Sequence, residues 1–161
     1  MQFDKAIQAL CDAGVEFIVI GGLAATLHGS AHVTFDLDIC YSRAPSNLRR
    51  LAAALAPFHP RLRDLPPGLP FVWDEVTLQN GTVFTLVTDL GKLDLLAEVA
   101  GLGPYREASQ RSVNVTVYGR TIRVLDLHGL IEAKRAAGRA KDLQVLPELE
   151  SLAEAEAAES E

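Results

Sequence analysis

The chain has few cysteines and no long apolar run. Only two of its 161 residues are cysteines, Cys11 and Cys40, and they do not form a C-x-x-C pair. We therefore expect core thiols, not a disulfide framework or a zinc site. No apolar stretch approaches the roughly 20 residues that a membrane-spanning helix needs. The segment Met1–Lys5 lacks the basic and apolar regions of a signal peptide. These features predict a cytoplasmic protein without a membrane partner.

Several catalytic motifs are also missing. The pair Gly21-Gly22 lacks the third glycine of a dinucleotide-binding fingerprint, and no serine or cysteine lies in a nucleophile motif. His28 and His32 are four residues apart, as in a zinc protease, but Gly29 stands where the catalytic glutamate would be. We interpret both histidines as polar residues near a site or as structural residues.

The end of the chain lacks basic residues. Residues 148–161 contain six glutamates and no Lys or Arg, so they account for the whole net charge of −6. The rest of the chain has 15 acidic and 15 basic residues, and residues 101–145 carry eight Lys or Arg against four acids. A neutral body with a basic C-terminal half permits an anionic partner such as a triphosphate or an RNA.

A glycine pair follows the most apolar short segment of the chain. Phe17–Ile20 is bounded by the pair Gly21-Gly22. This pattern is typical of a strand that ends in a phosphate-binding turn, although a glycine pair alone more often marks an ordinary turn.

Two alternating carboxylates come about a dozen residues later. Asp36 and Asp38 flank Leu37, and residues two apart in a strand point to the same side. Both carboxylates should therefore face one spot, while Phe35, Leu37 and Ile39 face the core. Two like charges that close repel each other unless a cation lies between them. The spacing predicts a divalent-metal site beside a glycine-lined phosphate cradle.

The combination resembles the DNA polymerase beta-type nucleotidyltransferase superfamily, whose signature is a glycine pair, a helix and D-x-D. The segments 21–25, 28–29 and 34–38 are similar to those of small bacterial nucleotidyltransferases. That group includes the toxin subunits of abortive-infection (type IV) toxin–antitoxin systems. The resemblance extends from about Phe3 to about Leu149. It implies a nucleotidyltransferase domain over residues 1–149, followed by an acidic helix end or tail over residues 150–161.

The resemblance also implies a third carboxylate on a neighbouring strand. Asp94 lies in the otherwise apolar segment Gly91–Leu96, where an unpaired ionised group is costly. It would serve as the third metal ligand or as the general base. The alternative is a strand-end aspartate that caps a turn or pairs with an arginine. Asp89 is a weaker candidate, because its position before Gly91 suits a tight turn.

Cationic residues should lie on a later helix. Lys134 is seven residues after Leu127, so it falls on the buried face of its helix. Small members of the family carry a similar lysine, followed by Ala-Gly-Arg and Lys-Asp; here these are residues 137–139 and 141–142. The resemblance implies nucleotide binding by Gly21, Gly22, Lys134 and Arg139. The alternative for Lys134 is that its ammonium reaches solvent while its stem packs on the core.

The apolar pattern predicts a small mixed β-sheet flanked by helices, an α/β (α+β) fold of the polymerase-beta-like nucleotidyltransferase type. We expect helices at residues 3–13, 23–27, 46–56 and 127–137, and a last one from Pro147 that frays after Leu152. The expected strands are residues 17–20, 37–41, 83–87 and 93–99, with a hairpin of residues 113–117 and 121–125.

The predicted activity is metal-dependent transfer of a nucleoside monophosphate from a nucleoside triphosphate to an acceptor hydroxyl, with release of pyrophosphate. Asp36, Asp38 and Asp94 would hold two Mg²⁺ ions, or Mn²⁺ in their place. The acceptor could be tRNA or another RNA, a protein or a small molecule, and an antitoxin would be the partner of a toxin-like subunit. One alternative is a catalytically silent nucleotide- or partner-binding module. Another is an antibiotic nucleotidyltransferase, although those usually have a longer second domain.

Overall fold

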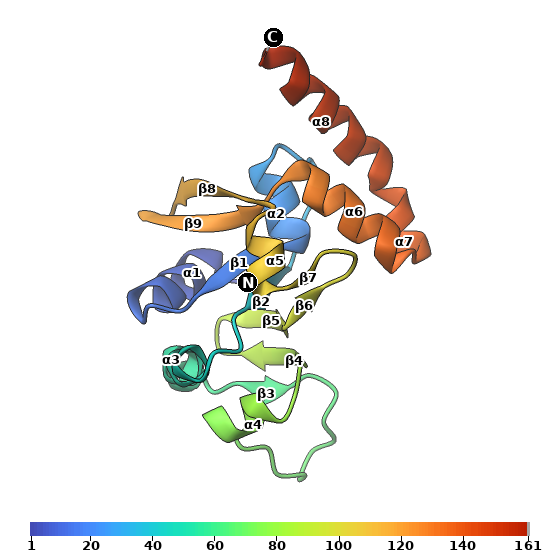
Figure 1. Cartoon of the computed structure of the whole chain (residues 1–161). Helices are drawn as coiled ribbons and strands as arrows, with labels where there is room; N and C mark the ends of the chain where they lie inside the picture. Colours follow the sequence, from blue (N-terminus) through green and yellow to red (C-terminus); the bar gives the residue numbers. More distant parts are fainter. Residues whose placement is uncertain (161) are drawn as a thin grey trace.

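The apolar segments form a mixed sheet of seven strands (Figure 1), seen in a computed structural model that describes residues 1–160. In sheet order the strands are β3 (Arg61–Leu62), β4 (Val83–Thr88), β5 (Gly91–Leu96), β2 (Asp36–Tyr41), β1 (Phe17–Ile20), β9 (Arg120–Leu125) and β8 (Ser112–Val117). The pairs β2–β5 and β1–β9 are parallel, and the other neighbours are antiparallel. A separate ribbon joins β6 (Glu98–Val99) to β7 (Gly103–Pro104).

Helices connect and flank these strands. They are α1 (Phe3–Asp12), α2 (Gly21–Leu27), α3 (Pro45–Leu55), α4 (Glu75–Gln79), α5 (Tyr105–Ser109), α6 (Leu127–Ala137), α7 (Ala140–Gln144) and α8 (Leu146–Glu159), with a 3₁₀ turn at Ala56–Phe58. Figure 1 shows α8 extending away from the sheet, beyond α6 and α7, with the C-terminus at its far end. None of the helices within residues 1–160 is both long and apolar enough to cross a membrane.

The core lies along the two central strands. All four residues of β1 are buried, as are Leu37 and the last three residues of β2. The amphipathic helices α1 and α3 contribute Ile7, Leu10, Leu48 and Leu51 to the same cluster. Apolar burial on this scale is the main driving force for folding. It holds the central strands, and with them the start of α2, in a fixed arrangement.

Local signals set several boundaries as the sequence predicts. Asp126 caps α6 by accepting a 2.6 Å hydrogen bond from the backbone N–H of Gly129. Gly138 ends that helix in the left-handed region, with φ of 66°. The predicted hairpin is also confirmed, since β8 and β9 pair antiparallel. Its two-residue turn, Tyr118-Gly119, has positive φ at both positions, as type I′ hairpin turns require.

Three expectations about the elements are wrong. Phe35 does not face the core: it is 74% exposed, because β2 begins only at Asp36 and the alternation does not reach back to it. The strand expected over residues 93–99 is divided, because β5 ends at Leu96 and the next residues pair with β7. The last helix does not fray after Leu152 but continues to Glu159, in keeping with the strong helix propensity of its alanines and glutamates.

Substitutions on the two sides of the start of β2 test which residues pack in the core. We expect Leu37→Ala to lower the free energy of unfolding by about 2–5 kcal/mol, because Leu37 is fully buried and its loss leaves a cavity. Phe35→Ala, two residues earlier and largely exposed, should change it by about 0.5 kcal/mol or less. Urea unfolding of both variants measures the difference, and equal losses would contradict the assigned start of β2.

Candidate functional site

A row of paired residues crosses the centre of the sheet. Asp38 of β2 is opposite Asp94 of β5 on one side and opposite Ile20 of β1 on the other. Asp94 is in turn opposite Thr85 of β4. Because directly paired residues point to the same face of a sheet, the two carboxylates stand side by side. Since α2 begins immediately after Ile20, the row also places them beside the glycine pair.

A cavity of about 440 Å³ opens over this row. It is lined by six of the seven residues that the sequence proposes for a site, namely Gly21, Asp36, Asp38, Asp94, Lys134 and Arg139. The seventh, Gly22, lines a neighbouring cavity of about 120 Å³ that shares Gly21 and Lys134 with the first. The structure thus brings residues from β1–α2, β2, β5, α6 and the start of α7 to one place.

The side chains of Asp38 and Thr34 lie so close to the start of α2 that only glycine fits at positions 21 and 22. Gly21 adopts a left-handed backbone with φ of 67°, and a Cβ at this position would collide with Oδ2 of Asp38. A Cβ at Gly22 would lie 2.5 Å from Oγ1 of Thr34. Any larger residue at either position would displace the side chain of Asp38 or of Thr34. The two glycines therefore allow the carboxylate of Asp38 to lie against the start of α2.

The carboxylate of Asp38 sits in an unfavourable place for a negative charge. Burial, together with the neighbouring carboxylates of Asp94 and Asp36, raises the pKa of Asp38 to about 7. Lys134 acts in the opposite direction. A divalent cation would relieve the same repulsion, and carboxylate oxygens are the donors that Mg²⁺ prefers. The residues present therefore suit a hard divalent metal.

The three carboxylates are not, however, gathered into a ready-made ligand set. Within residues 1–160 no group of three His, Cys, Asp or Glu side chains is placed to hold a metal ion. Asp36, Asp38 and Asp94 line one cavity, and their joint role as metal ligands stays a prediction.

An arginine that the sequence does not reveal forms an ion pair with one of these carboxylates. Nη2 of Arg63 donates to Oδ1 of Asp94 at 2.8 Å and to the carbonyl oxygen of Leu86 at 2.9 Å. The pairing of Asp94 with an arginine was left open from the sequence, but the arginine could not be named. Arg63 lies in the proline-rich segment 57–70, and only the pairing of β3 with β4 places it at the site.

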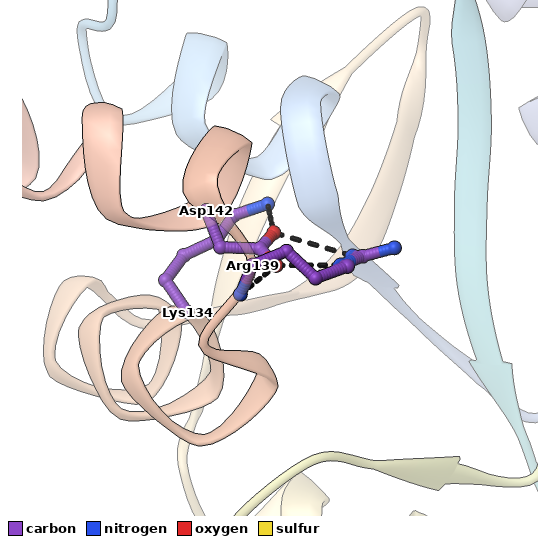
Figure 2. Close-up of polar contacts among 3 residues, drawn as sticks. All are labelled: Lys134, Arg139 and Asp142. Carbon is purple, nitrogen blue, oxygen red and sulfur yellow. Dashed lines mark hydrogen bonds and ion pairs between the residues drawn. The ribbon is translucent and has the colours of Figure 1, made fainter.

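A second charged cluster joins the two proposed phosphate-binding cations, Lys134 and Arg139, through Asp142 (Figure 2). The side chain of Asp142 is 1% exposed. It accepts from Nε of Arg139 at 2.6 Å and from Nζ of Lys134 at 3.4 Å, and these contacts lower its pKa, with Arg139 contributing most. Lys134 therefore does not reach freely into solvent. In the sequence Asp142 was noted only as part of a Lys-Asp pair, and its central position was not foreseen.

The remaining polar candidates lie outside the main cavity. Nε2 of His28 is 2.8 Å from the carbonyl oxygen of Leu125, which fits the structural interpretation of this histidine. His32 is largely exposed, with Nε2 3.8 Å from Glu148. Asp89 is bound by His59 at 2.6 Å and does not line the cavity, so it remains the weaker carboxylate candidate.

Comparisons with known proteins identify two solved structures of similar fold. No protein-family model and no curated protein matches the sequence. Among solved structures, the chain is similar to TM1012 of Thermotoga maritima, a candidate nucleotidyltransferase, with a TM-score of 0.57 and 17% identity over 91% of this chain and 88% of that one. It is equally similar to ANT(2'')-Ia in complex with adenylyl-2''-tobramycin, with a TM-score of 0.57 and 14% identity over 99% of this chain and 97% of that one.

The chain shares its fold with these two solved structures. The predicted fold class, a mixed sheet flanked by helices, is confirmed. ANT(2'')-Ia does not meet the expectation that an antibiotic nucleotidyltransferase has a longer second domain, since the match covers 97% of that chain and 99% of this one. The resemblance to abortive-infection toxins stays a prediction.

The raised pKa of Asp38 predicts a pH-dependent stability of the metal-free protein. The folded state holds a proton on Asp38 that the unfolded chain loses near pH 4, so stability should fall as the pH rises from about 4 through 7. Asp38→Asn removes this loss. With a chelator at pH 8, we expect the variant to be more stable than wild type by on the order of 1–3 kcal/mol.

Thermal unfolding of both proteins from pH 4 to pH 8 measures this difference. Asp64→Asn is the control, because Asp64 is exposed and outside the cavity. If wild type and Asp38→Asn keep parallel stability curves across this range, Asp38 is not held in a repulsive environment.

Proposed function

We propose that the protein is a metal-dependent nucleotidyltransferase, which moves a nucleoside monophosphate from a nucleoside triphosphate to an acceptor hydroxyl. The observation that carries the proposal is the direct pairing of Asp38 with Asp94 in a cavity that also contains Gly21, Lys134 and Arg139. Two adjacent carboxylates suit divalent cations, and two cations opposite them suit phosphate oxygens. The fold shared with TM1012 and ANT(2'')-Ia supports the same reaction class.

Asp36, Asp38 and Asp94 would hold the divalent metal, two Mg²⁺ ions or Mn²⁺ in their place. The metal supplies neutralisation of the triphosphate and activation of the acceptor hydroxyl when it is bound. Asp94 would also accept the proton of that hydroxyl. The acceptor oxygen bonds to the α-phosphorus, the bond from this phosphorus to the bridging oxygen breaks, and pyrophosphate leaves. The protein contributes mainly positioning and charge.

Lys134 and Arg139 would bind the triphosphate. The ammonium of Lys134 has three donors and uses one on Asp142, so two remain for phosphate oxygens. The side chain of Arg139 is 61% exposed although its guanidinium is bound to Asp142 through two nitrogens. Asp142 would thus keep both cations at the cavity before a nucleotide arrives. Gly21 and Gly22 would leave room for the phosphates beside Asp38.

The acceptor has two candidate classes. ANT(2'')-Ia was solved with an adenylylated aminoglycoside, and its match over nearly the whole of both chains favours a small-molecule acceptor. The motif resemblance to abortive-infection toxins favours an RNA or protein acceptor and an antitoxin partner. A catalytically silent binding module is the alternative outside enzymes, and the presence of Asp36, Asp38 and Asp94 in one cavity argues against it.

The central test is loss of transfer on removing one carboxylate. We expect Asp38→Asn to reduce Mg²⁺-dependent pyrophosphate release by about 100-fold or more, because one ligand charge is lost while the side-chain shape is kept. Each nucleoside triphosphate carries a label on its phosphates. Total RNA, protein or aminoglycosides are supplied as acceptors. Asp89→Asn should keep wild-type activity, because Asp89 does not line the cavity. Undiminished transfer by Asp38→Asn would refute the assignment.

A binding experiment tests Lys134. Lys134→Ala should weaken binding of a nucleoside triphosphate by about 1–3 kcal/mol, the range for losing a charged hydrogen bond. The free energy of unfolding should change less, because Arg139 still pairs with Asp142. Arg135→Ala is a matched control on the same helix, since Arg135 is exposed and bound to Glu150. Calorimetric titration with Mg²⁺ present measures both, and equal affinities would give Lys134 a structural role and leave Arg139 as the better phosphate candidate.

A further inference from the structure

Arg63 reaches the site through a continuous set of contacts. Its backbone N–H donates to the carbonyl oxygen of Thr85 at 2.9 Å, which extends the pairing of β3 with β4 by one residue. Thr85 is directly opposite Asp94 on the next strand. Arg63, Thr85, Asp94 and Asp38 therefore lie in one line across the sheet, and the only cation in this line is Arg63.

The pair of Arg63 and Asp94 is well shielded. Their side chains are 23% and 22% exposed, so water screens them less than it screens a surface ion pair. Asp94 has no other ion-pair partner within residues 1–160. Without Arg63, the carboxylates of Asp94 and Asp38 would lie side by side, and no cation would be paired with Asp94.

The guanidinium is only partly satisfied in this position. Nη2 makes both of the hydrogen bonds described above, whereas Nε is buried and has no partner among the described residues. A buried donor left without a partner lowers the stability of the arrangement. Arg63 is thus held firmly enough to neutralise Asp94 but is not locked into a complete set of contacts.

We propose that Arg63 is a resident counter-ion, which pairs with Asp94 in the metal-free protein and competes with a divalent cation for that carboxylate. This inference rests on the proposed function, because it takes Asp94 as a metal ligand. Arg63 is a positioning residue here. It sets when Asp94 becomes available for a metal.

The test measures Mn²⁺ binding, which does not depend on knowing the acceptor. Arg63→Gln should bind Mn²⁺ on the order of tenfold more tightly than wild type, because the cation no longer has to break a charged hydrogen bond. The gain should vanish when Asp94 is replaced. The Asp94→Asn variant and the double variant Arg63→Gln/Asp94→Asn should bind Mn²⁺ with equal affinity. Arg61→Gln, an exposed arginine on the same strand, is the matched control and should leave the affinity unchanged.

The outcomes separate this inference from the proposed function. If no protein binds Mn²⁺, or if Asp38→Asn binds it as wild type does, the metal site itself is refuted, and the role of Arg63 is refuted with it. If Asp38→Asn abolishes binding but Arg63→Gln has wild-type or weaker affinity, the metal site stands and the counter-ion role is overturned. A weaker affinity would mean that Arg63 orients Asp94 instead of competing for it.

A structure of the wild-type protein with Mn²⁺ provides a test that does not depend on the folding of a variant. We expect the guanidinium of Arg63 to have left Asp94 when Mn²⁺ is bound. An intact pair at 2.8 Å beside a bound ion would overturn the inference.

Discussion

The parallel pairing of β2 with β5 is the constraint on which the site depends. It puts Asp38 directly opposite Asp94, although 56 residues separate them in the chain. A slip of one residue would turn Asp94 to the other face of the sheet and place a leucine beside Asp38. The register is held by buried leucines and isoleucines on the opposite face of both strands, so the hydrophobic core and the chemistry of the cavity are set by the same contacts.

The negative charges that this register collects are partly offset by cations from three other parts of the chain. Arg63 pairs with Asp94, Lys134 lies close enough to Asp38 to favour its ionised form, and Asp142 keeps Lys134 beside Arg139. Each cation thus has a protein partner before any nucleotide is present. Such pairing fixes the positions of the cations at the cavity, and it limits the cost of burying charge. Binding of phosphate or metal then becomes an exchange of partners.

The local parts of the fold are predictable from the sequence because short-range interactions determine them. The strand Phe17–Ile20, the hairpin turn at Tyr118-Gly119 and the ends of α6 all follow from periodicity, turn residues and capping residues. The helices of five residues, α4, α5 and α7, were not foreseen, since one turn carries too little pattern.

Within the site, the common face of Asp36 and Asp38 and the glycine pair before them are predictable, because both are properties of one short segment. The resemblance to a family added Asp94, Lys134 and Arg139. Four features come from long-range packing: Asp94 lies beside Asp38, Arg63 pairs with Asp94, Asp142 joins the two cations, and Phe35 is exposed. The physical reason is that strand partners and ion-pair partners far apart in the chain are chosen by the packing of the whole domain, which no local pattern encodes.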